Sequence, residues 1–324
     1  MSFRKGPAMA RDVTLRQLEY LVAVADLGTL AAAAHATHVS TTGLAAALNE
    51  LEGTVGTPLT VRRRAKGVQL TPAGRVAVER ARELLTRAER LVEAVDHEVG
   101  HMRGALRVGC FTTLTPWVFP QLLDHFARRH PDVELDVGED SSPRLVAQLR
   151  AGRRDVVVLF ASHLDGHKEF TSWEPETLDR EGLVVRRLHE ARPRVLLPRS
   201  HRLAGRESVR LGELDGEPGI LLDVDPVRKI LTGVLERAGL MGNIAWSTPN
   251  ANVVRNVVGR GLAWSILVGL GAGMRSPEGN ELVALHIEDE LPANGVVAVT
   301  LAGMAPGPKV LEALNVLTHR EVLH

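Results

Sequence analysis

Residues 71–102 restrict the fold of this chain most, because they read as one long, uninterrupted helix. An apolar stripe runs along this segment, and charged residues cover the rest of its surface. The stripe consists of Leu84, Leu85, Ala88, Leu91, Val92, Val95 and Val99. A lone helix of this length is marginal in water. We therefore expect the stripe to pack against a partner, most simply the same helix of a second chain.

The sequence pattern before the long helix differs from the pattern after it. We expect a short basic tail at residues 1–11, a small helical domain with a β-hairpin at 12–70, the linker helix at 71–103, and an α/β domain at 104–324. Two or three domains are usual for 324 residues. In the last region short apolar runs alternate with helical patterns, which predicts βαβ units and a parallel sheet.

Helical patterns and one hairpin are expected in the N-terminal domain. Apolar residues recur at helical spacing over residues 15–25. Thr29 and Ser40 each stand where a side chain can cap the start of a further helix. The second of those helices carries an apolar stripe, formed by Leu44, Leu48 and Leu51. The β-like runs at 59–64 and 68–71 then predict the two arms of a hairpin.

Charge is balanced over the whole chain but concentrated locally. Lys+Arg and Asp+Glu both number 39, so the net charge is +0 and a uniformly basic surface is excluded. The run RRRAK at residues 62–66 lies between the arms of the hairpin. By contrast, the stretch from His38 to Glu52 contains no Lys or Arg, although it has the form of the second helix of a helix-turn-helix.

A series of short motifs occurs over residues 15–74, and their order and spacing hold without an insertion or deletion. They are LRQLEYLVAVADLGT, the pair Ala33-Ala34, HVS, LNELEGTVGTPL and LTPAG. Further along the chain GALRVGC, HPDVEL, LLPRSHRLAG and VVGRGLAWSIL follow in order. In this order and spacing the sequence resembles the LysR-type transcriptional regulators over nearly its whole length.

The resemblance implies an α/β protein with an N-terminal all-α winged helix-turn-helix, a long linker helix and a two-subdomain effector domain similar to periplasmic solute-binding proteins. Subdomain I is expected at 104–187 and 268–324, and subdomain II at 188–267. Such a protein is a bacterial, cytoplasmic homodimer or homotetramer that binds promoter or operator DNA and a small-molecule effector. No cofactor is implied. No membrane span is expected, because the longest apolar run, 262–274, is too short.

Departures from the family pattern affect how DNA would be read. The usual Gln-Pro-Ala-Leu-Ser and basic residue are replaced by TTGLAA at residues 41–46, and Thr60 stands in place of an aromatic residue. The candidate DNA-binding residues are Thr29, Ser40, Thr41, Thr42, Ala45, Ala46, Asn49, Arg62, Arg63, Arg64 and Lys66. Thr, Asn and Ala side chains can contact base edges and methyl groups. The charge that drives affinity would have to come from the wing.

Two other functions compete with this interpretation. The uncharged helix is also compatible with a small-molecule-binding module whose DNA binding is degenerate and which acts through protein partners. An enzyme is the third possibility, since an α/β fold does not determine function. We do not expect one, because the sequence lacks GxSxG, Walker A and HExxH motifs and a GxGxxG opening a helix after a strand.

The resemblance also implies an effector cleft between the two subdomains. The candidate effector-binding residues are Thr112, Thr113, Leu114, Asp223, Asp225, Thr248, Asn250 and Trp264. Thr112 and Thr113 precede a predicted helix, where they could bind an anion or carboxylate or merely cap the helix. Acidic residues at the other end would favour an amine or several hydroxyls. Trp264 either narrows the cleft or fills the core.

Cysteine and histidine usage suggests neither a redox switch nor a metal site. Cys110 is the single cysteine, so it has no resolving partner in its own chain, and a buried core position is the favoured interpretation. Among the 13 histidines, two closely spaced pairs, His163 with His167 and His35 with His38, invite a metal hypothesis. Neither pair comes with a third strong ligand, and no metal is expected.

Overall fold

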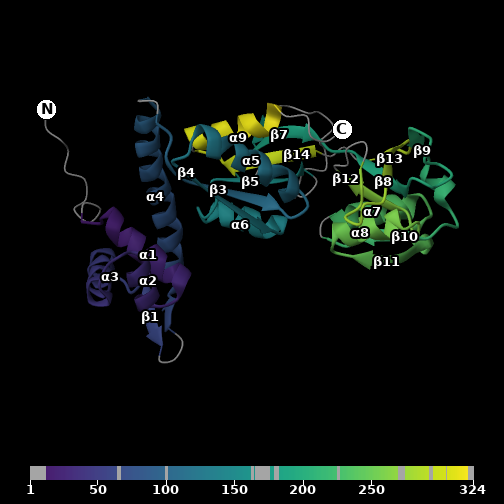
Figure 1. Cartoon of the computed structure of the whole chain (residues 1–324). Helices are drawn as coiled ribbons and strands as arrows, with labels where there is room; N and C mark the ends of the chain where they lie inside the picture. Colours follow the sequence, from purple (N-terminus) through teal and green to yellow (C-terminus); the bar gives the residue numbers. More distant parts are fainter. Residues whose placement is uncertain are drawn as a thin grey trace. The chain divides into compact units, whose positions relative to one another are not determined.

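The structure is a computed structural model, and its chain divides by internal contacts into two compact units. One comprises residues 1–102 with 150–153, and the other 103–149 with 154–324 (Figure 1). The described residues are 12–63, 67–98, 101–161, 164, 176–178, 182–224, 227–268, 274–291, 295–303 and 305–319. Within these ranges, no helix is both long and apolar enough to cross a membrane.

The first unit has the architecture of a winged helix-turn-helix, as predicted. Its elements are α1 (Leu15–Leu27), α2 (Leu30–Ala36), α3 (Thr41–Val55), β1 (Thr60–Arg63), β2 (Gly67–Leu70) and α4 (Pro72–Glu98). The two strands pair antiparallel and form the wing. Its core is closed, because Leu21, Ala33, Leu44, Leu51 and Leu59 are each at most 1% exposed. The expected stripe of Leu44, Leu48 and Leu51 is the buried face of α3.

The LTPAG motif has a structural explanation at the start of α4. The backbone N–H of Thr71 donates to the carbonyl oxygen of Leu59 over 3.0 Å. The hydroxyl of Thr71 accepts the N–H of Gly74 at 2.9 Å, which satisfies one free donor of the first helical turn. The backbone of Gly74 lies so close to Leu59 that an added Cβ would stand 1.9 Å from that carbonyl oxygen. Only glycine fits this approach of helix to wing.

The linker helix α4 buries one face and leaves apolar residues on the other. Val78 and Ala81 are buried in the core of the first unit. Leu84, Leu91 and Val95 are 51%, 70% and 60% exposed. These residues belong to the predicted stripe, whose last member, Val99, lies outside the described residues. The single chain thus leaves much of the stripe in water, at a cost of roughly 25 cal/mol for each Å² of apolar surface.

A six-stranded sheet forms the first part of the second unit. Its strands, in spatial order, are β4 (Val133–Asp140), β3 (Gly104–Phe111), β5 (Val156–Phe160), β14 (Gly295–Leu301), β7 (Leu183–Glu190) and β6 (Glu176–Leu178). Helices α5 (Thr115–Arg129) and α9 (Pro308–His319) lie side by side on one face, and α6 (Ser142–Arg150) lies on the other (Figure 1). Strand β3 runs parallel to β4 and β5, as predicted, but β14 is antiparallel to β5 and β7. The sheet is therefore mixed, and the predicted parallel arrangement holds for β4, β3 and β5 but not for β14, β7 and β6.

Two smaller sheets form the rest of this unit. The four-stranded sheet has the order β12 (Ser265–Val268), β8 (Pro193–Pro198), β13 (Leu282–Ile287) and β9 (Ser208–Val209). Strand β10 (Gly219–Leu222) pairs parallel with β11 (Ile244–Thr248), and α7 (Val227–Arg237) and α8 (Ala251–Gly259) complete the layer. Because β13 pairs with β8, the second subdomain reaches at least Ile287. The expected boundary at residue 268 was therefore too early.

Replacing Gly74 with alanine should destabilise the first unit by about 1–3 kcal/mol, the usual cost of overpacking, because the new Cβ would stand 1.9 Å from the Leu59 oxygen. Gly53→Ala is the matched control. Gly53 is also helical, and a Cβ there meets nothing within 4 Å. This control should stabilise the chain by about 0.5–1 kcal/mol. Amide hydrogen exchange of residues 15–70 at increasing urea concentration measures both effects. Equal protection in Gly74→Ala and wild type would contradict the prediction.

Candidate DNA-binding surface and effector site

The exposed face of α3 carries the residues predicted to read DNA. Thr41, Thr42, Ala46 and Asn49 are exposed, and Ala45 is half-buried. These side chains lie opposite the buried leucine stripe. One face of the helix therefore packs in the core, and the other faces outward, where it could enter a groove of DNA. Within this helix there is no Lys or Arg on either face. Direct contacts from α3 would therefore be hydrogen bonds and methyl contacts.

Thr29 and Ser40 act first as helix caps. The Thr29 hydroxyl accepts the N–H of Ala32 at 3.2 Å, and the Ser40 hydroxyl accepts the N–H of Gly43 at 3.0 Å. Each hydroxyl still has a proton to donate. The turn between α2 and α3 includes His38 with φ of 55°, a left-handed conformation that is uncommon outside glycine. Caps and turn together determine where α3 begins.

The wing is held by an acidic residue that the sequence analysis did not identify. Glu52, near the end of α3, accepts the backbone N–H groups of Leu59 and Thr60, each at 2.8 Å. The same carboxylate oxygen accepts the hydroxyl of Thr60 at 3.0 Å. Thr60 stands where the family has an aromatic residue, and here it takes part in this bond. Glu52 therefore binds the first strand of the wing to α3.

The basic residues of the wing lie largely beyond what the structure describes. Arg62 and Arg63 fall in β1, but their side chains are not among the described ones. Arg64 and Lys66 lie outside the described residues. A backbone hydrogen bond of 2.8 Å from Val68 to the carbonyl of Gly28 connects the second strand to the turn after α1. Both strands of the wing are thus hydrogen-bonded at its base, β1 to Glu52 and β2 to Gly28.

The turn after β3 departs from one expectation. Thr112 is exposed, Thr113 is half-buried and Leu114 is buried. The residue at the N-cap of α5 is Leu114, and within the described residues no side chain caps this helix start. The interpretation of Thr112 or Thr113 as a cap was therefore wrong, so neither hydroxyl is committed to capping. Leu114 is 3% exposed and packs in the core.

The other predicted effector residues gather near the ends of β10 and β11. The N–H of Asp223 donates to the carbonyl of Thr248 over 2.8 Å, so these two residues are adjacent. Asn250 caps α8 by accepting the N–H of Asn252 at 2.9 Å. The carboxylate of Asp223 lies 3.6 Å from the guanidinium of Arg228. Asp225 lies outside the described residues.

Trp264 fills the core of the second subdomain. It is 2% exposed, and its indole N–H donates to the carbonyl oxygen of Glu217 over 3.0 Å. The ring covers Gly219, where an added Cβ would stand 3.0 Å from it. Of the two interpretations of Trp264, the geometry favours core filling over a role in ligand contact. A bulky indole opposite a glycine keeps the layer closely packed.

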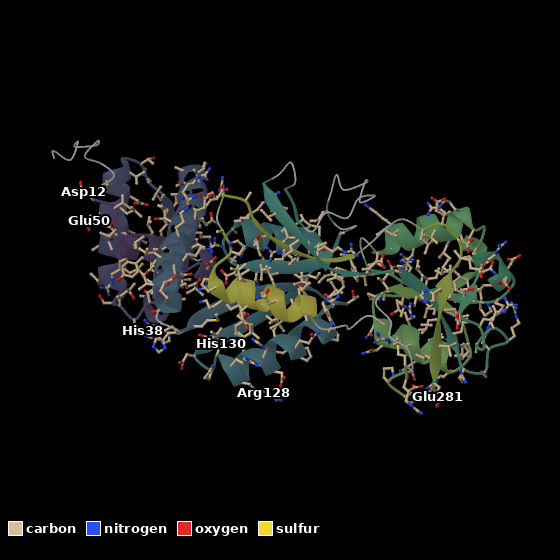
Figure 2. All side chains as sticks on the ribbon, turned by 90° about the horizontal axis from the view of Figure 1, so that it is seen from above. Asp12, His38, Glu50, Arg128, His130 and Glu281 are labelled. Carbon is tan, nitrogen blue, oxygen red and sulfur yellow. The ribbon has the colours of Figure 1, made fainter. Side chains whose placement is uncertain are left out.

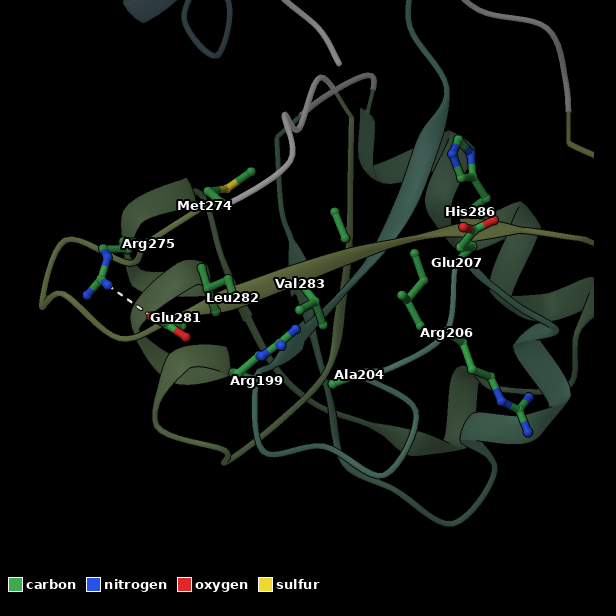
Figure 3. Close-up of a pocket in the computed structure, with 12 residues that line it drawn as sticks. Arg199, Ala204, Arg206, Glu207, Met274, Arg275, Glu281, Leu282, Val283 and His286 are labelled. Atoms are coloured by element: carbon green, nitrogen blue, oxygen red, sulfur yellow. Dashed lines mark hydrogen bonds and ion pairs between the residues drawn. The ribbon is translucent and has the colours of Figure 1, made fainter.

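A hollow of 570 Å³ lies elsewhere in the second subdomain (Figure 3). Its lining includes Arg199, Arg206, Glu207, Arg275, Glu281 and His286 around an apolar floor from β13. Arg275 and Glu281 form an ion pair at 2.9 Å across one end. None of the predicted effector residues lines it. Sequence reasoning missed this hollow because its walls come from segments far apart in the chain.

Two protein families match separate parts of this chain. Residues 15–75 match the bacterial regulatory helix-turn-helix of the lysR family, and residues 100–321 match the LysR substrate binding domain. The chain belongs to the LysR family. It is therefore a DNA-binding transcriptional regulator with an effector-binding domain. The alternative of a binding module with degenerate DNA binding is not favoured, because the helix-turn-helix match covers residues 15–75, from α1 to the start of α4.

Individual relatives agree with this assignment. The HTH-type transcriptional regulator TtuA of Agrobacterium vitis is 32% identical over 78% of this chain and 79% of its own length. A hydrogen peroxide-inducible genes activator of Dickeya chrysanthemi is 27% identical over 80% of each chain. The LysR family regulator HinK of Pseudomonas aeruginosa is 29% identical, with a TM-score of 0.56 over 94% of this chain and 97% of that one. A full-length OxyR variant of the same species shares the fold, with a TM-score of 0.71 at 23% identity over 96% of each chain.

Replacing Glu52 with alanine should loosen the wing by about 1–3 kcal/mol, because the N–H groups of Leu59 and Thr60 lose a charged acceptor. Glu52→Gln keeps one acceptor oxygen and should fall between alanine and wild type. Glu19→Ala, an exposed position on α1, is the control. Amide exchange at Leu59 and Thr60 reports the loosening directly. If Glu52→Ala leaves those two amides as protected as in Glu19→Ala, the carboxylate does not hold the wing.

Proposed function

We propose that this regulator binds promoter or operator double-stranded DNA with two separate contributions. The exposed face of α3, with Thr42 and Asn49, reads base edges and methyl groups in the major groove. The arginines of the wing supply the phosphate contacts and hence most of the affinity. The observation that carries this proposal is the complete absence of Lys and Arg from α3 beside an Arg run on the wing. Sequence preference would then depend strongly on DNA shape and groove width.

We propose an effector site that includes Thr112, Thr113, Asp223, Thr248 and Asn250, with Asp225 as a further candidate. The two hydroxyls before α5 suit a carboxylate or other anion, since the helix start adds partial positive charge. The carboxylate of Asp223 suits an amine or hydroxyl groups. An amino-acid-like effector meets both demands. Leu114 and Trp264 leave the set because both are buried in the core.

We propose that effector binding acts by a population shift. The effector would favour one packing of the subunits, and this packing would change the spacing or angle of paired winged helices and so the bend in the DNA. Paired helices require self-association. The exposed residues Leu84, Leu91 and Val95 of α4 support a homodimer, and two such dimers would give a homotetramer.

The proposed working divisions of the chain follow from these roles. In this division the tail at 1–11 precedes the DNA-binding domain at 12–70. The linker helix at 71–103 pairs two chains, and residues 104–324 bind the effector. A protein that binds bacterial promoter DNA works in the cytoplasm, and we propose that location and no membrane association. We propose no catalytic activity, because the family acts by binding DNA and effector.

The signal is proposed to be a bound molecule and not an oxidation. Some relatives are named hydrogen peroxide-inducible genes activators. In this chain the single cysteine, Cys110, is buried in β3, and burial raises the pKa of its thiol to about 12. A thiol that stays protonated is a poor nucleophile toward peroxides. With one cysteine, no disulfide can form within the chain.

The wing arginines are tested by a triple change of Arg62, Arg63 and Arg64 to alanine. Fluorescence anisotropy on the DNA upstream of the chain's own gene, against scrambled DNA at several salt concentrations, gives affinity and salt slope. The slope should fall by roughly 0.9 for every phosphate contact removed. Asn49→Ala is the contrasting variant. It should lower the preference for the specific site by about 1–3 kcal/mol and leave the slope unchanged. An unchanged slope in the triple variant would refute the wing's role.

Cys110 should be unreactive in the native protein. With its pKa raised to about 12 by burial, the thiol stays almost wholly protonated near neutral pH. Ellman's reagent should therefore label the native chain only very slowly and the urea-unfolded chain at once. Peroxide treatment should leave DNA affinity unchanged in wild type and in Cys110→Ala alike. Rapid native labelling, or a peroxide effect abolished by Cys110→Ala, would contradict this prediction.

A further inference from the structure

Three side chains with no role in the proposed regulation meet between α5 and α9. His125 lies on α5, His130 follows its last turn, and Glu312 lies on α9 (His130 is labelled in Figure 2). The Nε2 atom of His125 is 2.7 Å from Oε1 of Glu312, and Nε2 of His130 is 3.8 Å from the same oxygen. One ligand atom from each residue lies within 4.8 Å of the other two. No other group of three such residues comes this close in the part of the chain that the structure describes.

The donor set and its spacing suit a small divalent ion. Two imidazole nitrogens and a carboxylate oxygen are typical ligands of Zn²⁺. Around a tetrahedral ion with bonds of about 2.0–2.2 Å, neighbouring donor atoms stand roughly 3.3–3.6 Å apart. The two contacts to Glu312, at 2.7 and 3.8 Å, bracket that separation. The shorter contact is the hydrogen bond expected without an ion, and it would open slightly as the ion replaces the shared proton.

The surroundings of the three residues favour a cation. The side chains of His125, His130 and Glu312 are 22%, 25% and 29% exposed, so an ion would keep access to water. His130 occupies the C-cap of α5, and its backbone N–H donates to the carbonyl of Phe126 over 2.9 Å. The free carbonyls at a helix C-terminus carry partial negative charge, which stabilises a bound cation. Of the two arginines in the last turn of α5, Arg128 and Arg129, the guanidinium of Arg128 is paired with Asp124 at 2.6 Å.

A simple ion pair does not account for the whole arrangement. Glu312 and His125 alone would complete a hydrogen-bonded pair. The Nε2 atom of His130 nevertheless lies 3.8 Å from the same carboxylate oxygen, beyond hydrogen-bonding distance. Its ring lies 5.8 Å from that of Phe126 and 5.9 Å from that of His125. A second imidazole thus lies close enough to Glu312 and His125 to act as the third metal ligand.

We propose that His125, His130 and Glu312 bind one divalent ion of the zinc class, with at least one coordination position left to water. The ion would join two helices that are neighbours on one face of the six-stranded sheet, through residues 187 positions apart in sequence. It would thus stabilise the docking of α9. The proposed metal site is separate from the proposed effector site, whose candidate residues lie at the turn before α5 and in the second subdomain.

The test uses full-length protein produced without a histidine tag, stripped with EDTA and then desalted. Competition with a chromophoric zinc chelator gives stoichiometry and affinity, and Co²⁺ replaces Zn²⁺ for visible spectroscopy. We expect one ion per chain. His130→Gln and Glu312→Gln should each weaken binding by at least about 10-fold. His286→Gln, an exposed histidine on β13, is the matched control and should bind like wild type.

Two further measurements keep the outcome decisive. His130→Gln leaves the hydrogen bond between His125 and Glu312 in place, so its circular dichroism spectrum should match wild type. Added Zn²⁺ should raise the Tm of wild type and of His286→Gln, but not of His130→Gln. Equal zinc affinity in wild type and His130→Gln would overturn the proposal, and so would zinc binding that is absent from wild type. The contact between α5 and α9 would then be an ion pair alone, and the proposed DNA binding would be unaffected.

Discussion

The backbone of Leu59 is the point on which the DNA-binding unit depends. Its N–H is bound by the carboxylate of Glu52 on α3, and its carbonyl oxygen accepts the N–H of Thr71 at the start of α4. Its side chain is 1% exposed in the shared core. One residue therefore connects α3, the wing and the linker helix. This junction therefore joins the start of the linker helix directly to the base of the wing.

The reading helix shows how affinity and specificity can be divided between elements. The side of α3 that faces away from the core carries hydroxyl, methyl and amide groups and the exposed carboxylate of Glu50. The Glu52 carboxylate is occupied by the wing backbone. Such a face offers little Coulomb attraction, so it has little tendency to bind DNA of arbitrary sequence. In the proposed mode of binding, discrimination rests on the fit of short side chains in a DNA groove of the right width, and this fit depends on DNA shape.

Local elements could be predicted from the sequence, while pairings between distant segments could not. Capping residues and apolar periodicity are local signals, and they placed α1 to α4 and the wing correctly. Strand β7 gives no clear local signal, because LVVRRLHE mixes apolar and charged residues in a pattern without clear alternation. The pairing of β13 with β8 joins residues 84 to 92 positions apart, which no local pattern reveals. That pairing moved the subdomain boundary.

Candidate sites are harder to predict than elements, because residue type alone does not reveal burial. Trp264 had the size and position of a ligand contact, yet Gly219 opposite it makes room for the indole inside the core. Thr112 and Thr113 had the chemistry of helix caps, yet the N-cap position of α5 is one residue later, at Leu114, and no side-chain hydrogen bond caps the helix. The pair His125 and His130 carried no signal because a spacing of five does not place two side chains on one helical face. It acquires meaning only when α9 supplies Glu312 from the far end of the chain. The convergence of these three side chains is a property of the two helices packed on the sheet, so no single segment of the sequence shows it.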